Sequence, residues 1–207
     1  MTLNLPARPS VYCVVSDQTE QVYNEWLVLR CQGGDREAIG ALVEHWQPHL
    51  IRFAQVVVRD ADLAQEATQE TWISTIAGLS RLRDPRTFKT WLFRIAHNKC
   101  RDLLRKRAPE LPAESEPTGR IHLNALENRE QIEQTLAMLS EDHRAVLALH
   151  YLHDMELAEI AQSLDVPLGT VKSRLHHARE SFRRTLDEEE QHGSTGRQDQ
   201  KSAVANG

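Results

Sequence analysis

Cysteine is scarce in this chain, and no two cysteines have the close spacing of a disulfide framework or a Cys-x-x-Cys motif. Cys13, Cys31 and Cys100 form an odd set, far apart in the sequence, which is typical of proteins kept in a reducing compartment. The chain also lacks an apolar run near the roughly 18 residues that a membrane span requires. Its first residues lack the basic-then-apolar order of a signal peptide. We therefore expect a cytoplasmic protein.

Aromatic residues are also few, at 5% of the 207 residues, although hydrophobic residues together reach 40%. A core can form, but the residues that favour strands are thinly spread. Apolar residues recur instead at intervals of three and four, which predicts helices. Pro48 lies in one such stripe and is expected to start or kink a helix there. Asp60 and Asp62 are expected to precede another, with Ile73 and Ile76 among its apolar members.

The helical pattern falls into two stretches, residues 21–107 and residues 123–186. Between them, residues 108–122 contain three prolines and no helical period, which predicts a linker. Residues 1–20 and 187–207 show no apolar pattern and are expected to be flexible tails. The sequence therefore predicts an all-α protein of two small helical domains joined by a flexible linker.

The formal net charge of −5 conceals an uneven distribution. Residues 81–107 contain ten basic and two acidic residues, and residues 170–184 contain five basic residues and one acidic residue. Either basic stretch alone is also consistent with a solvated helix face. Two such stretches on an acidic background suggest two contacts with a polyanion, with the remaining surface left for a different partner.

The last patterned stretch has the spacing of a helix-turn-helix. Leu157, Ile160 and Leu164 would form the buried side of its first helix, and residues 165–169 would form the turn. Thr170 is expected to cap the second helix through its hydroxyl. The side chains left outward would lie in the half of the helix that such motifs place in the DNA major groove: Lys172, Ser173, His176, His177 and Arg179.

Three segments together resemble bacterial RNA polymerase sigma factors: DLAQEATQETWI, FKTWLFRIAHNKCRDLLRKR and LSEDHRAVLALHYLHDMELAEIAQSLDVPLGTVKSRLHHARESFRRTL. The resemblance is closest to the extracytoplasmic-function (ECF) group, which keeps only regions 2 and 4, and it covers residues 35–186. It implies region 2 within residues 21–107 and region 4 within residues 123–186. It also implies a non-enzymatic protein that binds core RNA polymerase and directs transcription initiation at specific promoters.

The resemblance implies roles for individual residues. Docking on the clamp helices of the polymerase largest subunit falls to Asp62, Gln65, Glu66 and Glu70. Opening of the −10 element falls to Arg83, Arg86, Lys89, Asn98 and Arg101. Reading of the −35 element falls to Thr170, Lys172, Ser173, His176, His177 and Arg179. The polymerase flap region, promoter DNA and an anti-sigma factor are further expected partners, without any cofactor or metal. Phe88 and Trp91 are expected in the core rather than as platforms for bases.

A metal-dependent enzyme is one alternative. Asp60, Asp62 and Glu66 lie close together in the sequence and could bind Mg²⁺, as in nucleases that carry helix-turn-helix domains. Acidic residues at a helix start more often complement the helix dipole, and no distant third carboxylate stands out.

A metal or redox sensor is a second alternative, because His97 with Cys100, or His150 with His153, could each supply two ligands. Two ligands do not close a site. A regulator that binds an operator unaided is a third alternative, but such a protein needs no polymerase-docking helix.

Overall fold

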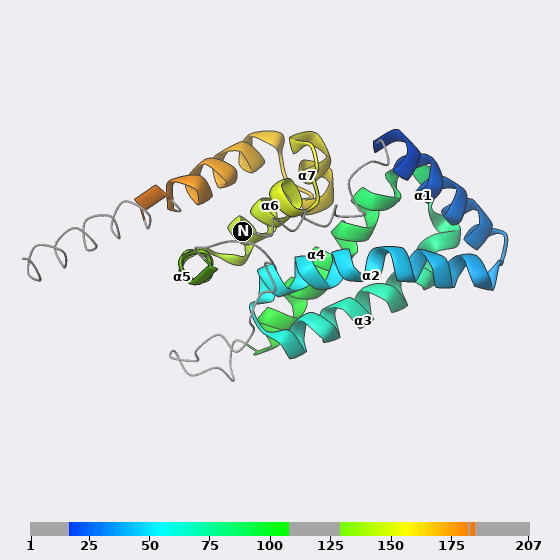
Figure 1. Ribbon diagram of the computed structural model, residues 1–207, viewed down its shortest axis with the longest axis horizontal. Helices are drawn as coiled ribbons and strands as arrows, with labels where there is room; N and C mark the ends of the chain where they lie inside the picture. The colour runs from blue at the N-terminus through cyan, green and yellow to red at the C-terminus, as the bar shows by residue number, and fades with distance from the viewer. Residues whose placement is uncertain (1–16, 108–128, 182, 185–207) are drawn as a thin grey trace, which may run out of the picture.

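The computed structural model describes residues 17–107 and 129–184 except Phe182, and every regular element in those ranges is helical (Figure 1). The N-terminal unit, residues 17–107, contains α1 (Asp17–Gln32), α2 (Arg36–Val58), α3 (Ala61–Gly78), the short helices η1 (Leu79–Arg81) and η2 (Pro85–Thr87), and α4 (Phe88–Arg107). The C-terminal unit, residues 129–184, contains α5 (Arg129–Met138), α6 (Glu141–Leu147), the π-helix η3 (Ala148–Leu152) and α7 (Leu157–Leu164). The "last helix" of this unit covers residues 168–181.

The all-α prediction with two helical units is confirmed. The predicted linker at 108–122, the tail at 187–207 and residues 1–16 of the N-terminal tail lie outside the described residues. Residues 17–20, predicted as part of that tail, belong to α1. Within the part of the chain that the structure describes, no helix is long and apolar enough to cross a membrane.

Two helix starts follow from side-chain caps. Asp35 accepts backbone bonds from Glu37 and Ala38 at the start of α2, and Asp60 accepts one from Leu63 at the start of α3. These side chains satisfy N–H groups that have no partner within the helix. Pro48, by contrast, starts no helix, because α2 continues through it. Burial of the apolar residues on both sides of Pro48 offsets the roughly 3 kcal/mol that an internal proline costs.

The core of the N-terminal unit is aromatic despite the small number of aromatic residues. The rings of Trp46 and Phe53 each contact that of Phe93, with centroids 6.1 and 5.3 Å apart. Phe88 is 1% exposed and lies 5.9 Å from Trp46, so its predicted core position is confirmed. Trp91 is half-buried beside Gly78, where a Cβ atom would lie 3.0 Å from the indole ring. The absence of a side chain at Gly78 therefore makes room for Trp91.

Two of the apolar residues expected in α3, Ile73 and Ile76, are exposed. Threonines occupy part of the buried side of α3 instead. Thr68 and Thr71 donate their hydroxyl hydrogens to the carbonyls four residues earlier, at 2.7 and 2.6 Å. Because these bonds satisfy the hydroxyls, threonine can be buried there at little cost, which leaves the larger isoleucines on the surface.

The two units pack directly against each other (Figure 1): α7 lies on α4, while α6 and η3 lie on α2. Arg94 of α4 donates to Asp165 after α7 at 3.3 Å, and Ser163 donates to the Thr90 carbonyl at 3.2 Å. Arg144 of α6 donates to the Val57 carbonyl at the end of α2, at 2.9 Å. We call this arrangement the closed packing.

His153, from the C-terminal unit, lies in the aromatic core of the N-terminal unit. Its ring is 4.5 Å from Phe93, and neither ring nitrogen has a hydrogen-bond partner. Burial lowers its pKa from 6.5 to about 3, and the positive charges of His49, Lys89 and Arg52 act in the same direction. His153 is therefore neutral in the closed packing.

His97 occupies a similar position on α4, where it is 2% exposed. Burial lowers its pKa from 6.5 to about 4 and outweighs the attraction of Asp142, whose carboxylate is 3.7 Å away. The charges of Arg101 and Arg174 also lower this pKa, whereas Glu141 raises it. Two neutral histidines thus lie where the units meet.

We expect acid to destabilise the closed packing. Both histidines have a lower pKa in this packing than when exposed, so the exposed states bind more protons and gain stability as pH falls below about 6.5. At pH 5.5 each histidine should cost about 1.4 kcal/mol relative to pH 7.5. Urea unfolding at the two pH values measures this loss.

His153→Phe should remove about half of the acid effect, because the phenyl ring packs among Phe53 and Phe93 without titrating. His177→Phe, at an exposed position of the last helix, is the matched control and should keep the full effect. An acid loss in His153→Phe equal to that of the unmodified protein would contradict the assignment.

Candidate nucleic-acid and polymerase interfaces

The helix-turn-helix spans α7 and the last helix. α7 ends at Leu164, and Asp165 adopts a left-handed conformation with φ of 55° that turns the chain. The last helix begins at residue 168, with Thr170 in its first turn. The Pro167 carbonyl accepts the N–H groups of Thr170 and Val171, at 2.9 and 3.2 Å. The predicted capping role of Thr170 was therefore wrong, because the helix starts before it.

The last helix has a buried and an exposed side. Val171, Leu175 and Ala178 are at most 4% exposed and face the core. The opposite side exposes all of the predicted outward residues, with Thr170 half-exposed beside them: Lys172, Ser173, His176, His177 and Arg179. This side offers cationic groups, a hydroxyl and imidazoles to solvent, which are groups that contact phosphates and base edges in DNA.

Arg174 belongs to the same basic stretch but does not join this surface. Its guanidinium pairs with Asp142 of α6, and the two side chains are 21% and 30% exposed. Asp142 also faces His97 of α4. Arg174 therefore fixes the last helix on α6, close to where the two units meet, a role that its place in a basic run did not indicate.

Sequence reasoning missed Tyr151 altogether. This η3 residue is 54% exposed, and its hydroxyl accepts a hydrogen bond from Arg179 at 2.7 Å. The only sequence signal is that a large aromatic residue directly follows Leu149, which is buried, and His150, which is half-buried. A π-helical turn cannot be read from 3.6-residue periodicity, so its exposure was not predictable.

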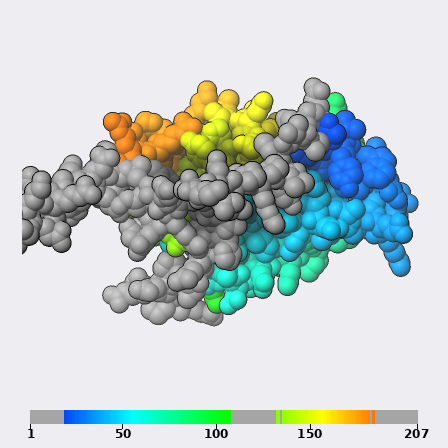
Figure 2. Space-filling model, viewed as in Figure 1, coloured from blue at the N-terminus to red at the C-terminus, as the bar shows by residue number. Residues whose placement is uncertain are grey.

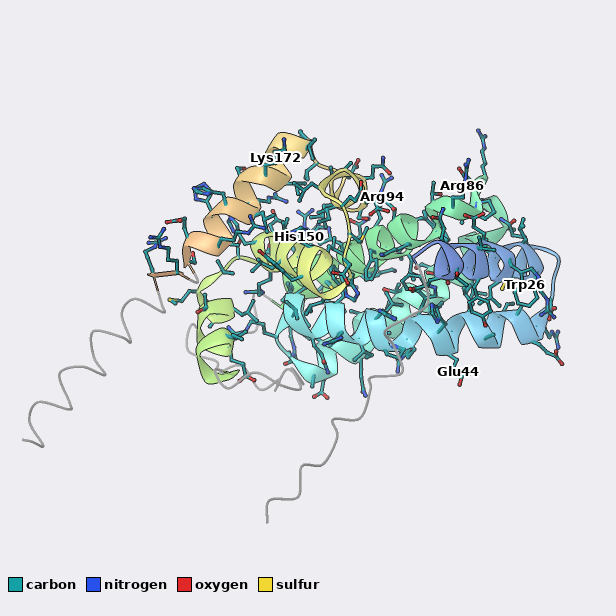
Figure 3. All side chains as sticks on the ribbon, turned by 45° about the horizontal axis from the view of Figure 1, so that its top comes forward. Trp26, Glu44, Arg86, Arg94, His150 and Lys172 are labelled. Atoms are coloured by element: carbon teal, nitrogen blue, oxygen red, sulfur yellow. The ribbon has the colours of Figure 1, made fainter. Side chains whose placement is uncertain are left out.

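The loop between α3 and α4 exposes Arg83 and Arg86, and Figure 3 shows Arg86 on the surface. Arg86 makes two bonds to Asp84, at 3.0 and 2.9 Å, and these hold the pKa of the Asp84 carboxyl below its usual range. The Gln32 amide of α1 donates to the carbonyls of Leu79 and Leu82, at 3.0 and 2.7 Å. The loop is thus tied to α1, with Arg86 fixed in orientation.

On α4 the predicted residues divide between two sides. Asn98 and Arg101 are exposed. Lys89 is half-buried, and its charge acts on His49 and His153. Nine residues correspond to two and a half helical turns, so Lys89 and Asn98 point in opposite directions. The structure therefore places Lys89 and Asn98 on opposite sides of α4.

A mixed acidic and apolar stripe runs along α3. Asp62, Glu66, Glu70, Ile73 and Ile76 follow one another at intervals of three or four residues, and we call them the α3 stripe. Asp62 and Glu66 are exposed, as is the neighbouring Gln65. Glu70 pairs with Lys99 at 3.1 Å. α3 forms an edge of the N-terminal unit that the C-terminal unit does not cover in the space-filling view (Figure 2).

The metal-site alternatives gain no support. No group of three His, Cys, Asp or Glu side chains is arranged to hold a metal ion within residues 17–107 and 129–184. Asp60 caps α3 and pairs with Arg107 at 3.0 Å. Burial raises the pKa of the Cys100 thiol to about 12, which leaves it unreactive at neutral pH.

Two family descriptions match the chain: Sigma-70 region 2 at residues 42–110, and Sigma-70, region 4 at residues 129–182. The RNA polymerase sigma-H factor of Pseudomonas aeruginosa is 32% identical over 183 residues, covering 80% of this chain and 95% of that protein. The ECF RNA polymerase sigma-E factor of Escherichia coli K12 is 31% identical, with coverage of 79% and 94%. SigW, an ECF RNA polymerase sigma factor of Bacillus subtilis, is 28% identical, with coverage of 74% and 91%.

Two solved structures are similar in fold. CnrH in complex with the cytosolic domain of CnrY has a TM-score of 0.62 at 27% identity, covering 80% of this chain and 97% of that chain. The sigma factor RpoE in complex with the anti-sigma factor NepR, from Bartonella quintana, has a TM-score of 0.61 at 25% identity, with coverage of 70% and 94%.

The two basic residues Arg174 and Lys172 should differ in their effect on stability. Arg174→Met removes a half-buried ion pair and leaves Asp142 unpaired beside neutral His97, so the free energy of unfolding should fall by about 1–2 kcal/mol. Lys172→Met, at an exposed position, should change it by less than about 0.5 kcal/mol. Urea unfolding of both variants at pH 7.5 measures this. Equal stability of the two variants would show that Arg174 is not a structural contact.

Proposed function

The chain belongs to the ECF sigma factors, which bind core RNA polymerase and direct transcription initiation at specific promoters, and we propose that three of its surfaces divide this work. The α3 stripe docks on the polymerase, the loop before α4 and the exposed side of α4 hold the opened −10 element, and the last helix reads the −35 element. The observation that carries this division is the last helix, whose buried side packs on the core while its opposite side presents a row of DNA-binding groups.

The proposal for α3 rests on its chemistry. Exposed isoleucines beside carboxylates form a surface suited to a partner that is both apolar and basic, since interface centres favour apolar contact and their rims carry charge. On this surface Asp62 and Glu66 supply negative charge and Gln65 supplies a polar group. Glu70 is paired with Lys99. The clamp helices of the polymerase largest subunit are the proposed partner.

The −10 proposal rests on exposed cations beside the N-terminal core. Arg83, Arg86 and Arg101 can neutralise phosphates of a single strand, which provides most of the affinity in such contacts. The neutral amide of Asn98 can donate a hydrogen bond to the same strand. Lys89 is half-buried on the side of α4 where its charge acts on His49 and His153. Separation of the two units would expose Lys89 more fully to a DNA strand.

The −35 proposal assigns bases and phosphates to different side chains of the last helix. The side chains of Ser173, His176 and His177 are short, so they can reach base edges only if the helix lies in the major groove. Thr170 lies at the N-terminal end of the helix, which enters the groove first. Lys172 and Arg179 can contact phosphates on either side.

Three further properties follow as proposals. A factor that works on polymerase and DNA acts in the cytoplasm, and it needs no catalytic group or cofactor of its own. One similar solved protein is bound to an anti-sigma factor and another to the cytosolic domain of CnrY. An inhibitory protein of the anti-sigma type is therefore a proposed partner, together with the polymerase flap region near the last helix.

The closed packing cannot serve both promoter elements at once. The elements are named for positions that lie about 25 base pairs apart, or about 85 Å at 3.4 Å per base pair. In the closed packing, Arg94 of α4 lies 3.3 Å from Asp165 in the helix-turn-helix (Figure 3). The two units must therefore separate when the polymerase engages a promoter.

A cleavable cross-link between the units should block this separation. We expect a short bis-maleimide carrying a disulfide to join Arg94→Cys and Asp165→Cys, because both side chains are exposed and their tips meet. With Cys13 replaced by serine, the cross-linked protein should lose run-off transcription with core polymerase and regain it after reduction. A matched pair within α2, Glu37→Cys and Glu44→Cys, lies on one exposed side of that helix and should cross-link without loss. Full transcription by the protein cross-linked between units would refute the requirement for opening.

Charge reversal in the α3 stripe should separate docking from folding. Glu66→Lys places a cation against the proposed basic partner surface and should weaken core-polymerase association at least tenfold, with run-off transcription falling in parallel. Glu44→Lys makes the same change on the exposed side of α2 (Figure 3) and should behave as the unmodified protein. Both variants should keep the thermal midpoint within a few degrees. Unchanged polymerase affinity in Glu66→Lys would exclude docking through this stripe.

A further inference from the structure

Arg179 of the last helix is held by two neighbouring residues of η3. Its Nε donates to the Tyr151 hydroxyl at 2.7 Å, and its guanidinium lies over the Tyr151 ring, 5.6 Å from the centroid. Its Nη2 lies 3.4 Å from His150 Nε2. The His150 and Tyr151 rings pack edge to face, with centroids 4.7 Å apart. Arg179 is thus held at two of its nitrogens.

Both contacts come from the π-helical turn η3. η3 covers Ala148–Leu152, continues directly from α6, and contacts α2 and α7. Its consecutive residues His150 and Tyr151 both reach Arg179 on the last helix. His150 Nδ1 also lies 3.4 Å from the Met155 carbonyl, which fixes its ring.

Tyr151 has no evident role in the core. It is 54% exposed, and its hydroxyl and ring both meet Arg179. No carboxylate pairs with Arg179 among residues 17–107 and 129–184. Tyr151 therefore orients the guanidinium without cancelling its charge, and Nη1 stays available to an anion.

The position of Arg179 indicates which anion. Lys172, His176 and Arg179 follow at intervals of four and three residues, so they share one side of the last helix. An arginine on that side, with one end of its fork held and the other free, can reach a phosphate flanking the groove. An arginine immobilised before binding loses less side-chain freedom when the DNA arrives.

We propose that Tyr151 is a positioning residue for promoter binding, which holds Arg179 in the orientation that contacts a phosphate beside the −35 element. This inference rests on the proposed role of the last helix. It predicts that the hydroxyl of Tyr151 matters only while Arg179 is present, that it affects affinity rather than choice of sequence, and that it contributes nothing to folding.

A double-mutant cycle in the complete holoenzyme tests this. Tyr151→Phe, Arg179→Ala and the double variant are combined with core polymerase. Each is titrated with a promoter duplex that the unmodified holoenzyme selects from a pool randomised at the −35 element. Tyr151→Phe should weaken binding about three- to tenfold. Arg179→Ala should weaken it at least as much and lower the salt slope by about one. The double variant should bind like Arg179→Ala alone.

Tyr23→Phe is the matched control, because it removes a hydroxyl from another partly exposed tyrosine, on α1 of the N-terminal unit, and it should change nothing. Thermal midpoints of all variants should agree within a few degrees, and the selected −35 sequences should stay the same. Additional loss from Tyr151→Phe in the Arg179→Ala background would show that Tyr151 contacts DNA itself and would overturn the proposal. A lower midpoint in Tyr151→Phe, matching its loss of binding, would assign it to folding instead.

Lys172→Ala distinguishes failure of this inference from failure of the proposed function. If Lys172→Ala weakens promoter binding while Tyr151→Phe does not, the last helix binds DNA and only the positioning role is wrong. If Lys172→Ala and Arg179→Ala both leave promoter binding unchanged, the role proposed for the last helix is wrong as well.

Discussion

Arg144 carries a positive charge into the joint between the two helical units. Its guanidinium donates to Val57 at the end of α2 and to Leu136 and Leu139 at the end of α5. Burial lowers its pKa to about 10, so it stays charged at neutral pH and complements the negative ends of both helices. Without it the Val57 and Leu139 carbonyls would lose this donor away from water, at a cost of about 1–3 kcal/mol each, whereas the Leu136 carbonyl would keep the Leu139 N–H. The position of α6, and with it η3 and α7 against the N-terminal unit, depends on this contact.

At the same joint, a single carboxylate connects the last helix to the N-terminal unit. Asp142 pairs with Arg174 of the last helix and faces His97 of α4. A change in the protonation of His97 therefore acts on the group that anchors the last helix. His153 lies neutral among phenyl rings, and the charges that act on its pKa, those of His49, Lys89 and Arg52, are all positive, so none of them would compensate a proton. The closed packing is therefore held by contacts whose strength changes with solution conditions.

In this sigma factor the closed packing leaves one proposed binding surface accessible and covers residues of another. α3 lies on the side of the N-terminal unit away from α6 and α7 (Figure 1), and Asp62, Glu66, Ile73 and Ile76 of the α3 stripe are exposed. The surface proposed for polymerase docking is therefore accessible before the units separate. Arg94 and Lys89, by contrast, face the C-terminal unit. Docking can therefore precede opening, and the binding of both units to one rigid polymerase would offset the free energy needed to open the joint.

The sequence by itself determined the helices, the two units, the helix-turn-helix and the outward side of the last helix. Each of these depends on residues three or four positions apart, and helical periodicity records that spacing directly. Only the tertiary structure decided that Ile73 is exposed, that the charge of Lys89 acts on His153, and that His153 enters the core of the other unit. It also decided the partners of Arg174 and Arg179, which lie 32 and 28 residues away in the chain. Such pairings depend on how whole helices pack, and no local pattern in the sequence records which distant side chains then meet.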